Sequence, residues 1–222
     1  MKKKIITMLL ATIVLLSSPI VGSAQESSTK AQPKKMSQKV ETSFDRFVGF
    51  VEKNLKIEND RYVLKNVDNV RAYIQSDFTN ISKILNVDTP NKAIKVLKER
   101  FEYLNNRADA GKITIFSDGS YYSGNMIFDR SSDHDVSTHW WGVRHAFYSS
   151  SAARSFASEI DGVSDLAAAA ATLFPGSVSS LVGTLTSWYL TVLAKDIRYW
   201  ADDTDHFNTD IAWTLNYRMY EN

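Results

Sequence analysis

The amino-acid sequence predicts an α+β fold: a helical N-terminal module, followed by a small antiparallel sheet that carries an apolar helical hairpin. Three observations lead to this prediction. Apolar residues recur at spacings of three and four up to about residue 110, which is typical of helices that bury one face. Stretches rich in β-branched and aromatic residues then flank a long segment without formal charge. Within that segment Pro175-Gly176 separates two helical patterns.

The first 24 residues have the three-part composition of a secretory signal peptide. Lysines at residues 2–4 precede an apolar stretch at residues 5–16, and the small residues Gly22 and Ala24 stand where a signal peptidase requires them. The apolar stretch is too short to cross a membrane as a helix. We therefore expect a secreted, extracellular protein that is cleaved after Ala24, and the lysine-rich start is typical of a Gram-positive exporter.

Composition excludes several classes of function. The formal net charge is +1, and removing residues 1–24 takes away three lysines and no acid, which leaves −2. This balance lacks the basic excess that nucleic-acid binding or a cationic antimicrobial peptide requires. The absence of cysteine excludes disulfides, thiol catalysis and cysteine-ligated metals. We expect no nucleic-acid partner and no cofactor.

The N-terminal half is predicted to contain a leader and a helical module. Residues 25–38 are almost entirely polar, which favours a flexible leader. Residues 39–110 form the helical module, in which Asn59-Asp60 marks a short hairpin or a loop. The clearest helix starts after Thr89, a capping residue, with Pro90 at its first position.

Residues 111–222 are predicted to combine β-strands with the helical hairpin, which covers about residues 151–200. Asp118-Gly119 is a hairpin turn. Two long strands are expected, at 136–148 and at 206–220, because both stretches alternate or are rich in aromatic residues. Between them lie two helices, roughly Ala152–Leu173 and Ser177–Tyr199, joined by a tight turn.

The second predicted helix carries two stripes that could be functional. The apolar contact stripe includes Leu181, Leu185, Trp188 and Val192, and a hydroxyl stripe lies about 100° around the helix, at Ser180, Thr184, Ser187 and Thr191. Small hydroxylated residues allow close helix approach in a membrane, so the hairpin could insert or form a homo-oligomer. The alternative is that the hairpin is the buried core of a soluble domain.

Adjacent tryptophans supply a second candidate contact surface. Trp140 and Trp141 have opposite parity in the predicted strand, so one ring would lie on each face of the sheet, with Arg144 nearby. One ring would pack on the hairpin, and the other would suit contact with carbohydrate, peptide or a bilayer interface. Burial of both rings is the alternative.

Metal-binding and catalytic patterns are sparse. Asp133, Asp135, Asp203, Asp205 and His206 flank the starts of the two predicted strands and could hold a hard cation such as calcium if those starts meet. Their spacing does not match an EF-hand, so polar capping loops are favoured and no metal is predicted. No Gly-x-Ser-x-Gly, phosphate-binding glycine loop or His-Glu-x-x-His motif is present, which disfavours an enzyme without excluding a cell-wall hydrolase.

Several of these features together resemble a group of small secreted Gram-positive proteins. They are the Tyr-Val-Leu stretch ending at Leu64, the His-Trp-Trp-Gly-Val-Arg element at His139–Arg144, the apolar helical pair around Pro175-Gly176 and the closing strand through Trp213. The resemblance implies a bacteriocin-like, uncharacterised protein and no catalytic residues. The leading hypothesis is a non-enzymatic factor that contacts a membrane or cell-surface component through the hairpin. The alternatives are a soluble extracellular binding or adhesion module and a cell-wall hydrolase.

Overall fold

Residues 35–123, 133–175 and 185–222 are described by a computed structural model, and they belong to one unit that spans residues 32–222. The predicted signal peptide and most of the predicted leader lie outside the described residues. The N-terminal elements are α1 (Gln38–Lys53), β1 (Leu55–Glu58), β2 (Arg61–Leu64), α2 (Val67–Ser76), α3 (Phe78–Leu85) and α4 (Pro90–Asp109). The C-terminal elements are β3 (Ile113–Ile115), β4 (Ser120–Ser123), β5 (His134–His139), β6 (Gly142–Phe147), α5 (Ser150–Ile160), α6 (Leu166–Leu173), α7 (Ser187–Asp203), β7 (Phe207–Ala212) and β8 (Tyr217–Glu221).

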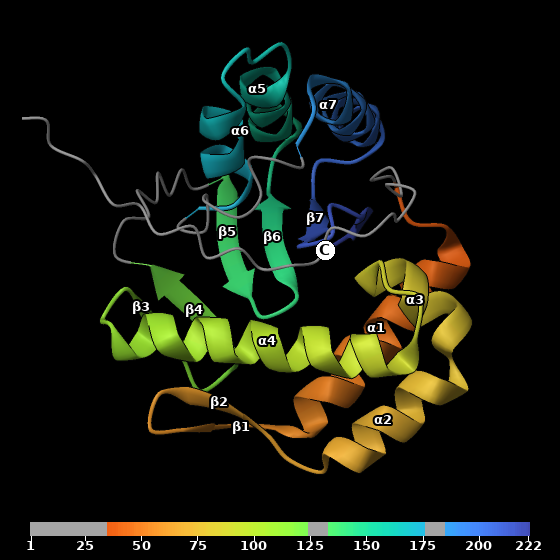
Figure 1. Cartoon of the computed structure of the whole chain (residues 1–222). Coiled ribbons are helices and arrows are strands. Elements are labelled where there is room, and N and C mark those ends of the chain that lie inside the picture. The colour runs from red at the N-terminus through yellow and green to blue at the C-terminus, as the bar shows by residue number, and fades with distance from the viewer. Residues whose placement is uncertain (1–34, 124–132, 176–184) are drawn as a thin grey trace, which may run out of the picture. The chain divides into compact units, whose positions relative to one another are not determined.

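The predicted α+β class is confirmed, and the local signals of the N-terminal half act as expected. Asn59 and Asp60 have φ of 52° and 57°, the left-handed pair that a two-residue hairpin needs, and they join β1 to β2. The Thr89 side chain accepts a hydrogen bond from the Lys92 amide at 3.3 Å, and Pro90 opens α4. Helix α4 lies alongside the other N-terminal helices in Figure 1.

The C-terminal sheet is an antiparallel meander in which β3 to β8 pair in sequence order. Both long strands that the sequence predicts are hairpins instead: residues 136–148 fold back at Trp140-Trp141, and residues 206–220 fold back between Ala212 and Tyr217. In the first hairpin His139 pairs with Gly142, so parity changes at the turn, and the stretch resembles one strand through its aromatic and β-branched composition alone. In the second hairpin Ile211 pairs with Tyr217, so parity is preserved, the alternation continues across the turn, and the sequence resembles one long strand.

The helical segment between β6 and β7 also differs from the predicted two-helix hairpin. The expected first helix is two helices, α5 and α6, because the chain turns at Gly162, where φ is +73°. Helix α7 starts at Ser187, where the Thr186 hydroxyl caps it, and ends at Asp203. Residues 176–184 of the expected second helix lie outside the described residues. Figure 1 places α5, α6 and α7 together beside β5, β6 and β7.

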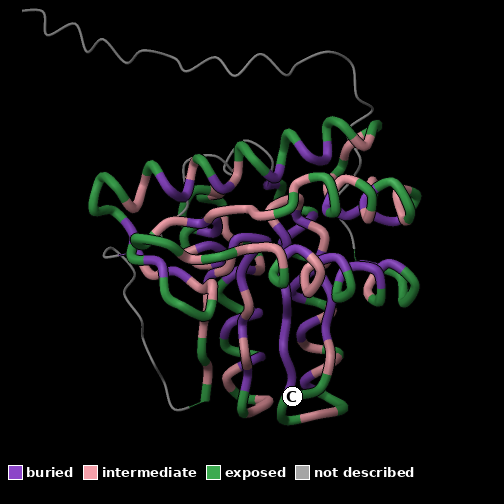
Figure 2. The backbone as a smooth tube through the Cα atoms, turned by 90° about the horizontal axis from the view of Figure 1, so that it is seen from below, coloured by how far each residue is buried: buried purple, intermediate pink, exposed green. Residues whose placement is uncertain are grey.

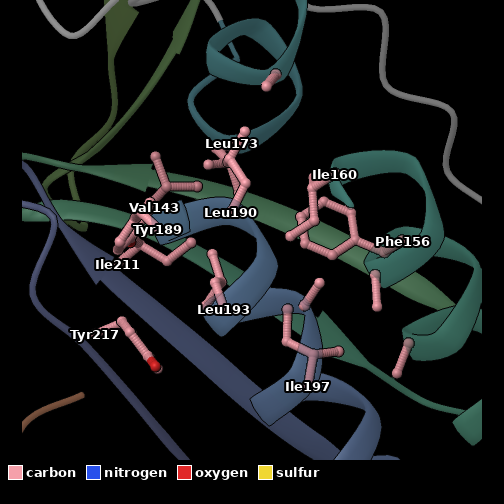
Figure 3. Close-up of a cluster of buried hydrophobic side chains, with 14 of the residues drawn as sticks. Val143, Phe156, Ile160, Leu173, Tyr189, Leu190, Leu193, Ile197, Ile211 and Tyr217 are labelled. Carbon is pink, nitrogen blue, oxygen red and sulfur yellow. The ribbon is translucent and has the colours of Figure 1, made fainter. Parts of the chain in front are cut away.

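Two apolar cores surround the sheet. The first lies between α5–α7 and one face of the sheet, where Leu190 and Leu193 meet Val143 and Ile211 (Figure 3). The second fills the space under α1–α4 and includes Trp140, Trp141 and Ala212, so the helical module packs on the turns at one end of the sheet. Figure 2 shows the buried strands in the middle of this arrangement. Burial of both cores is the main force that holds the layers together.

Residues 35–38, which the sequence assigns to the leader, are part of the folded unit. Met36 is buried, and its amide donates to the Tyr217 carbonyl at 2.7 Å. Lys35 forms an isolated parallel bridge with the same strand residue. The start of the described chain is thus attached to its last strand.

The first core contains two hydrogen-bonded histidines. His145 Nε2 lies 3.1 Å from the Leu173 carbonyl and must donate to it, so its Nδ1 accepts from His134 Nε2, 3.1 Å away. Burial lowers the pKa of His145 to about 3 and that of His134 to about 4. In this arrangement both rings are neutral, and each carries its proton on Nε2.

We predict that acid destabilises the fold between pH 6.5 and about 4. The unfolded chain binds protons at an ordinary histidine pKa of about 6.5, whereas His134, His139 and His145 take them up only near pH 3–4. The stabilisation that the three neutral histidines give is complete above pH 6.5. At pH 5 each histidine should lower the free energy of unfolding by about 2 kcal/mol. Urea denaturation at pH 7.5, 6 and 5 measures it. The exposed-site variant His206→Gln should keep the same dependence, and a free energy unchanged from pH 7.5 to 5 would refute the prediction.

Candidate functional site

A small pocket lies where α1, α3 and α4 meet the two turns of the sheet. Its volume is about 80 Å³. We call it the Trp–Arg pocket, and its lining residues are Phe44, Phe47, Ile84, Leu85, Val96, Leu97, Arg100, Trp140, Trp141, Ala212, Trp213 and Thr214. The lining is apolar apart from Arg100 and Thr214. The Thr214 hydroxyl already donates a hydrogen bond to the Ile84 carbonyl at 2.7 Å. Arg100 is the one charged side chain in the lining.

The two turns that frame the pocket are bound to each other. The Trp213 amide donates to the Trp141 carbonyl at 3.2 Å, and the Trp213 indole donates to the Trp140 carbonyl at 2.8 Å. Gly142 makes this close approach possible, because a Cβ there would overlap the Ile211 carbonyl oxygen and lie 2.9 Å from the Ala212 Cα. The sequence therefore needs glycine directly after the tryptophan pair.

Aromatic side chains fix the positions of the two turn tryptophans. The Trp141 ring meets Phe44 edge-on at 5.5 Å between centroids, and His139 stacks on it at 4.8 Å. The Trp140 ring contacts Phe47 and Phe101, both on helices of the N-terminal module. Such contacts add to the energy of burial and hold the rings in one orientation.

Arg100 reaches the pocket from α4, and its guanidinium lies 3.9 Å from the centre of the Trp213 ring. Its Nε donates to the Trp140 carbonyl at 3.1 Å and its Nη2 to the Tyr121 hydroxyl at 3.2 Å. Both acceptors are neutral. Burial lowers the pKa of Arg100, although its ordinary value is so high that the group stays charged.

The predicted contact residues of the tryptophan pair lie elsewhere than expected. Trp140 and Trp141 occupy the β5–β6 turn, and only 2% and 7% of their surfaces are exposed, so the prediction of one ring on each sheet face is wrong. The reason is the hairpin, which directs both rings into the helical module instead of across a strand. Both residues nevertheless line the pocket, whereas Arg144 does not.

The hairpin residues divide between the core and the outer surface. Leu185 is buried and precedes α7, whereas Trp188 is 56% exposed, Val192 is half-buried, and Ser187 and Thr191 are exposed. Ser180, Leu181 and Thr184 lie outside the described residues. The expected contact stripe is thus not the buried face of α7, which consists of Tyr189, Leu190, Leu193, Ala194, Ile197 and Ala201, and its role in membrane or partner contact stays a prediction.

The two acidic clusters lie at the same end of the sheet but remain apart. His134 pairs with Phe147, and Phe147 pairs with Phe207. The starts of β5 and β7 therefore lie at the same end of the sheet, with β6 between them. Two strand spacings separate such positions by about 10 Å. Among the described residues no group of three or more candidate ligands could hold a metal ion, so Asp133, Asp135, Asp203, Asp205 and His206 do not form a site there.

A row of charged residues, centred on the buried Asp210, crosses the opposite face of the sheet. Asp210, which is 1% exposed, accepts two hydrogen bonds from Arg144, at 2.7 and 3.1 Å, and others from Arg218 and Tyr220. Arg218 also pairs with Asp45 of α1 at 2.6 Å. Although burial acts to lower them, the bonds to Asp210 raise the pKa of both arginines above their ordinary value. Every charge in the row is compensated, which is what a structural network requires.

One arrangement bears on the hydrolase alternative. Ser137 Oγ lies 2.9 Å from His139 Nε2, and burial lowers the pKa of His139 to about 4, so the ring is neutral at pH 7. A nucleophilic serine also needs a group that orients the histidine. No carboxylate in the described part of the chain hydrogen-bonds the other ring nitrogen of His139, and this pair does not favour hydrolysis.

Sequence reasoning missed the charged row and the role of Arg100. The row has a signal in the alternate polar positions of β7 and β8, but that pattern predicts a solvated face and not a buried one. Arg100 belongs to a run of charges on α4, which normally indicates solvent exposure. Only the fold distinguishes it from its neighbours.

Comparisons with protein-family models, with curated proteins and with solved structures give no match for this chain. Within residues 35–123, 133–175 and 185–222, no helix combines the length and apolar character that a membrane crossing demands.

We predict that Gly142→Ala lowers the free energy of unfolding by about 3 kcal/mol, because the added methyl group must push the β5–β6 turn away from β7. Gly49→Ala is the matched control. Gly49 lies within α1, and no neighbouring atom comes within 4 Å of the place that an alanine methyl group would take. Alanine there should leave stability unchanged or raise it by up to about 1 kcal/mol. Urea denaturation of both variants measures the difference, and equal stabilities would contradict the prediction.

Proposed function

We propose that the chain is a secreted, non-enzymatic binding protein whose Trp–Arg pocket takes the apolar part of a small extracellular ligand. One observation carries this proposal: a concave, almost wholly apolar lining contains a single charged side chain that has no ionic partner among the described residues. Small-molecule sites typically combine apolar walls with a few polar groups in this way. The export signal predicted at residues 1–24 supports an extracellular role.

The size of the pocket limits the ligand. Its volume of about 80 Å³ is smaller than the engineered cavity of about 150 Å³ that binds benzene. A short alkyl chain or part of one aromatic ring therefore fits inside, and the rest of the ligand would extend out past Val96, which is partly exposed at 36%. This points to a ligand with a narrow apolar end.

We expect 1-hexanol to bind saturably and to shift the indole N–H signals of Trp140, Trp141 and Trp213 in nuclear magnetic resonance spectra. Trp188 and Trp200 are internal controls, because neither lines the pocket. Val96→Phe should weaken binding at least about tenfold by filling the entrance, since extra volume in a packed site is poorly tolerated. Lys98→Phe, an exposed change on the same helix, should not. If hexanol shifts no pocket indole, the proposal fails.

The outer face of α7 favours a second candidate function, contact with a membrane or cell-surface component. Trp188 and Tyr199 are 56% and 66% exposed and share one side of the helix with Val192 and Lys195. Tryptophan, tyrosine and lysine are the residues that lie at membrane–water interfaces. This supports a protein that rests on a surface, with the inner face of α7 retained as core.

For this second function we expect the chain to sediment with vesicles of mixed neutral and anionic phospholipid. Replacing Trp188 and Tyr199 together by serine should reduce the vesicle partition coefficient about tenfold, equivalent to about 1.4 kcal/mol. Tyr148→Ser removes another exposed aromatic ring, outside α7, and should change little. Self-association through α7 without vesicle binding would contradict membrane contact.

A further inference from the structure

We propose that the Trp–Arg pocket selects anionic ligands, and that Arg100 binds the carboxylate of a small apolar acid. This inference rests on the binding function proposed above and names the chemical class of its ligand. It is argued from the hydrogen bonding, surroundings and charge of Arg100.

Some N–H groups of Arg100 donate to no described residue. A guanidinium carries five N–H groups in a planar fork, and the described residues accept two of them, through the Trp140 carbonyl and the Tyr121 hydroxyl. The Trp213 ring covers one face of the group at 3.9 Å, which leaves its edge as the direction in which a further acceptor can bind. Two parallel bonds from such an edge are the usual way in which arginine holds a carboxylate.

Two other guanidiniums of the described residues, those of Arg144 and Arg218, are paired with carboxylates. Arg218 binds Asp210 and Asp45, and Arg144 binds Asp210 through two bonds. Arg100 forms no ion pair with any described residue, although its neighbourhood is apolar and aromatic. A desolvated charge without a counter-charge is costly, so a bound anion would stabilise this site.

A purely structural role for Arg100 predicts a different outcome. If Arg100 only held α4 against the two turns, it would need only its hydrogen bond to the Trp140 carbonyl and its contact with the Trp213 ring. The pocket would then bind apolar molecules without regard to head-group charge. Ligands that share one tail and differ in charge separate the two roles.

The test compares hexanoate, 1-hexanol and hexylamine at pH 7.5 by titration of the pocket indole signals. We expect the wild-type protein to bind hexanoate about 10- to 100-fold more tightly than hexanol, and hexylamine most weakly, as charge-assisted bonds in an apolar site imply. Arg100→Gln should bring hexanoate down to the affinity of hexanol while hexanol binding stays. Lys98→Gln removes the same charge from an exposed position of α4 and should keep the preference.

The outcomes separate the two proposals. Equal binding of hexanoate and hexanol by the wild-type protein overturns the role of Arg100 and leaves the pocket as a binding site. A preference for hexanoate that Arg100→Gln retains overturns it as well. If Arg100→Gln does not fold, the wild-type series and Lys98→Gln decide the question by themselves. If none of the three compounds binds, the binding function itself fails.

Discussion

The carbonyl oxygen of Trp140 is a central junction between the helical module and the two turns of the sheet. It accepts one hydrogen bond from the Trp213 indole at 2.8 Å and another from Arg100 at 3.1 Å. A carbonyl has two lone pairs, so its hydrogen-bonding capacity is used in full. The three donors and acceptors come from α4 and from both turns at one end of the sheet. The position of the pocket, the stacking of Arg100 and the burial of the tryptophan pair all depend on this junction.

Local chemistry made much of the fold predictable. The Asn59-Asp60 hairpin, the Thr89 cap with Pro90 and the Asp118-Gly119 turn each depend on a few neighbouring residues, and each forms as expected. The α+β class follows from them, because helical and extended patterns occupy separate halves of the chain. Errors arose where a turn lies inside a stretch of uniform composition: Trp140-Trp141 interrupts a run of aromatic and β-branched residues that is continuous in sequence.

The candidate site depends on long-range register, which no local pattern contains. In the sequence Arg100 is one of several charges on α4. Its contact with Trp213, more than a hundred residues further along the chain, exists only in the folded structure. Asp210 falls between Arg144 and Arg218 only because β6, β7 and β8 pair in one particular alignment. Polar residues occupy alternate positions of β7 and β8, and the fold joins Asp210 and Arg218 of that face to Arg144 in a compensated ionic network. The polar character of these strand positions was thus predictable, whereas their ion-pair partners and their burial were not.

The attachment of residues 35 and 36 to Tyr217 has a consequence for the time at which this protein can fold. The first described residues pair with β8, the last strand. Strand β6 pairs with β7, which follows it in the sequence only after α5, α6 and α7. Closing such distant pairings is slow, and the contacts of residues 35 and 36 cannot form before the ribosome has synthesised β8. The fold of the nascent chain therefore stays incomplete until β8 has been made. A polypeptide in that condition is suited to threading through a narrow export channel, as the segment from Lys2 to Ala24 predicts for this one.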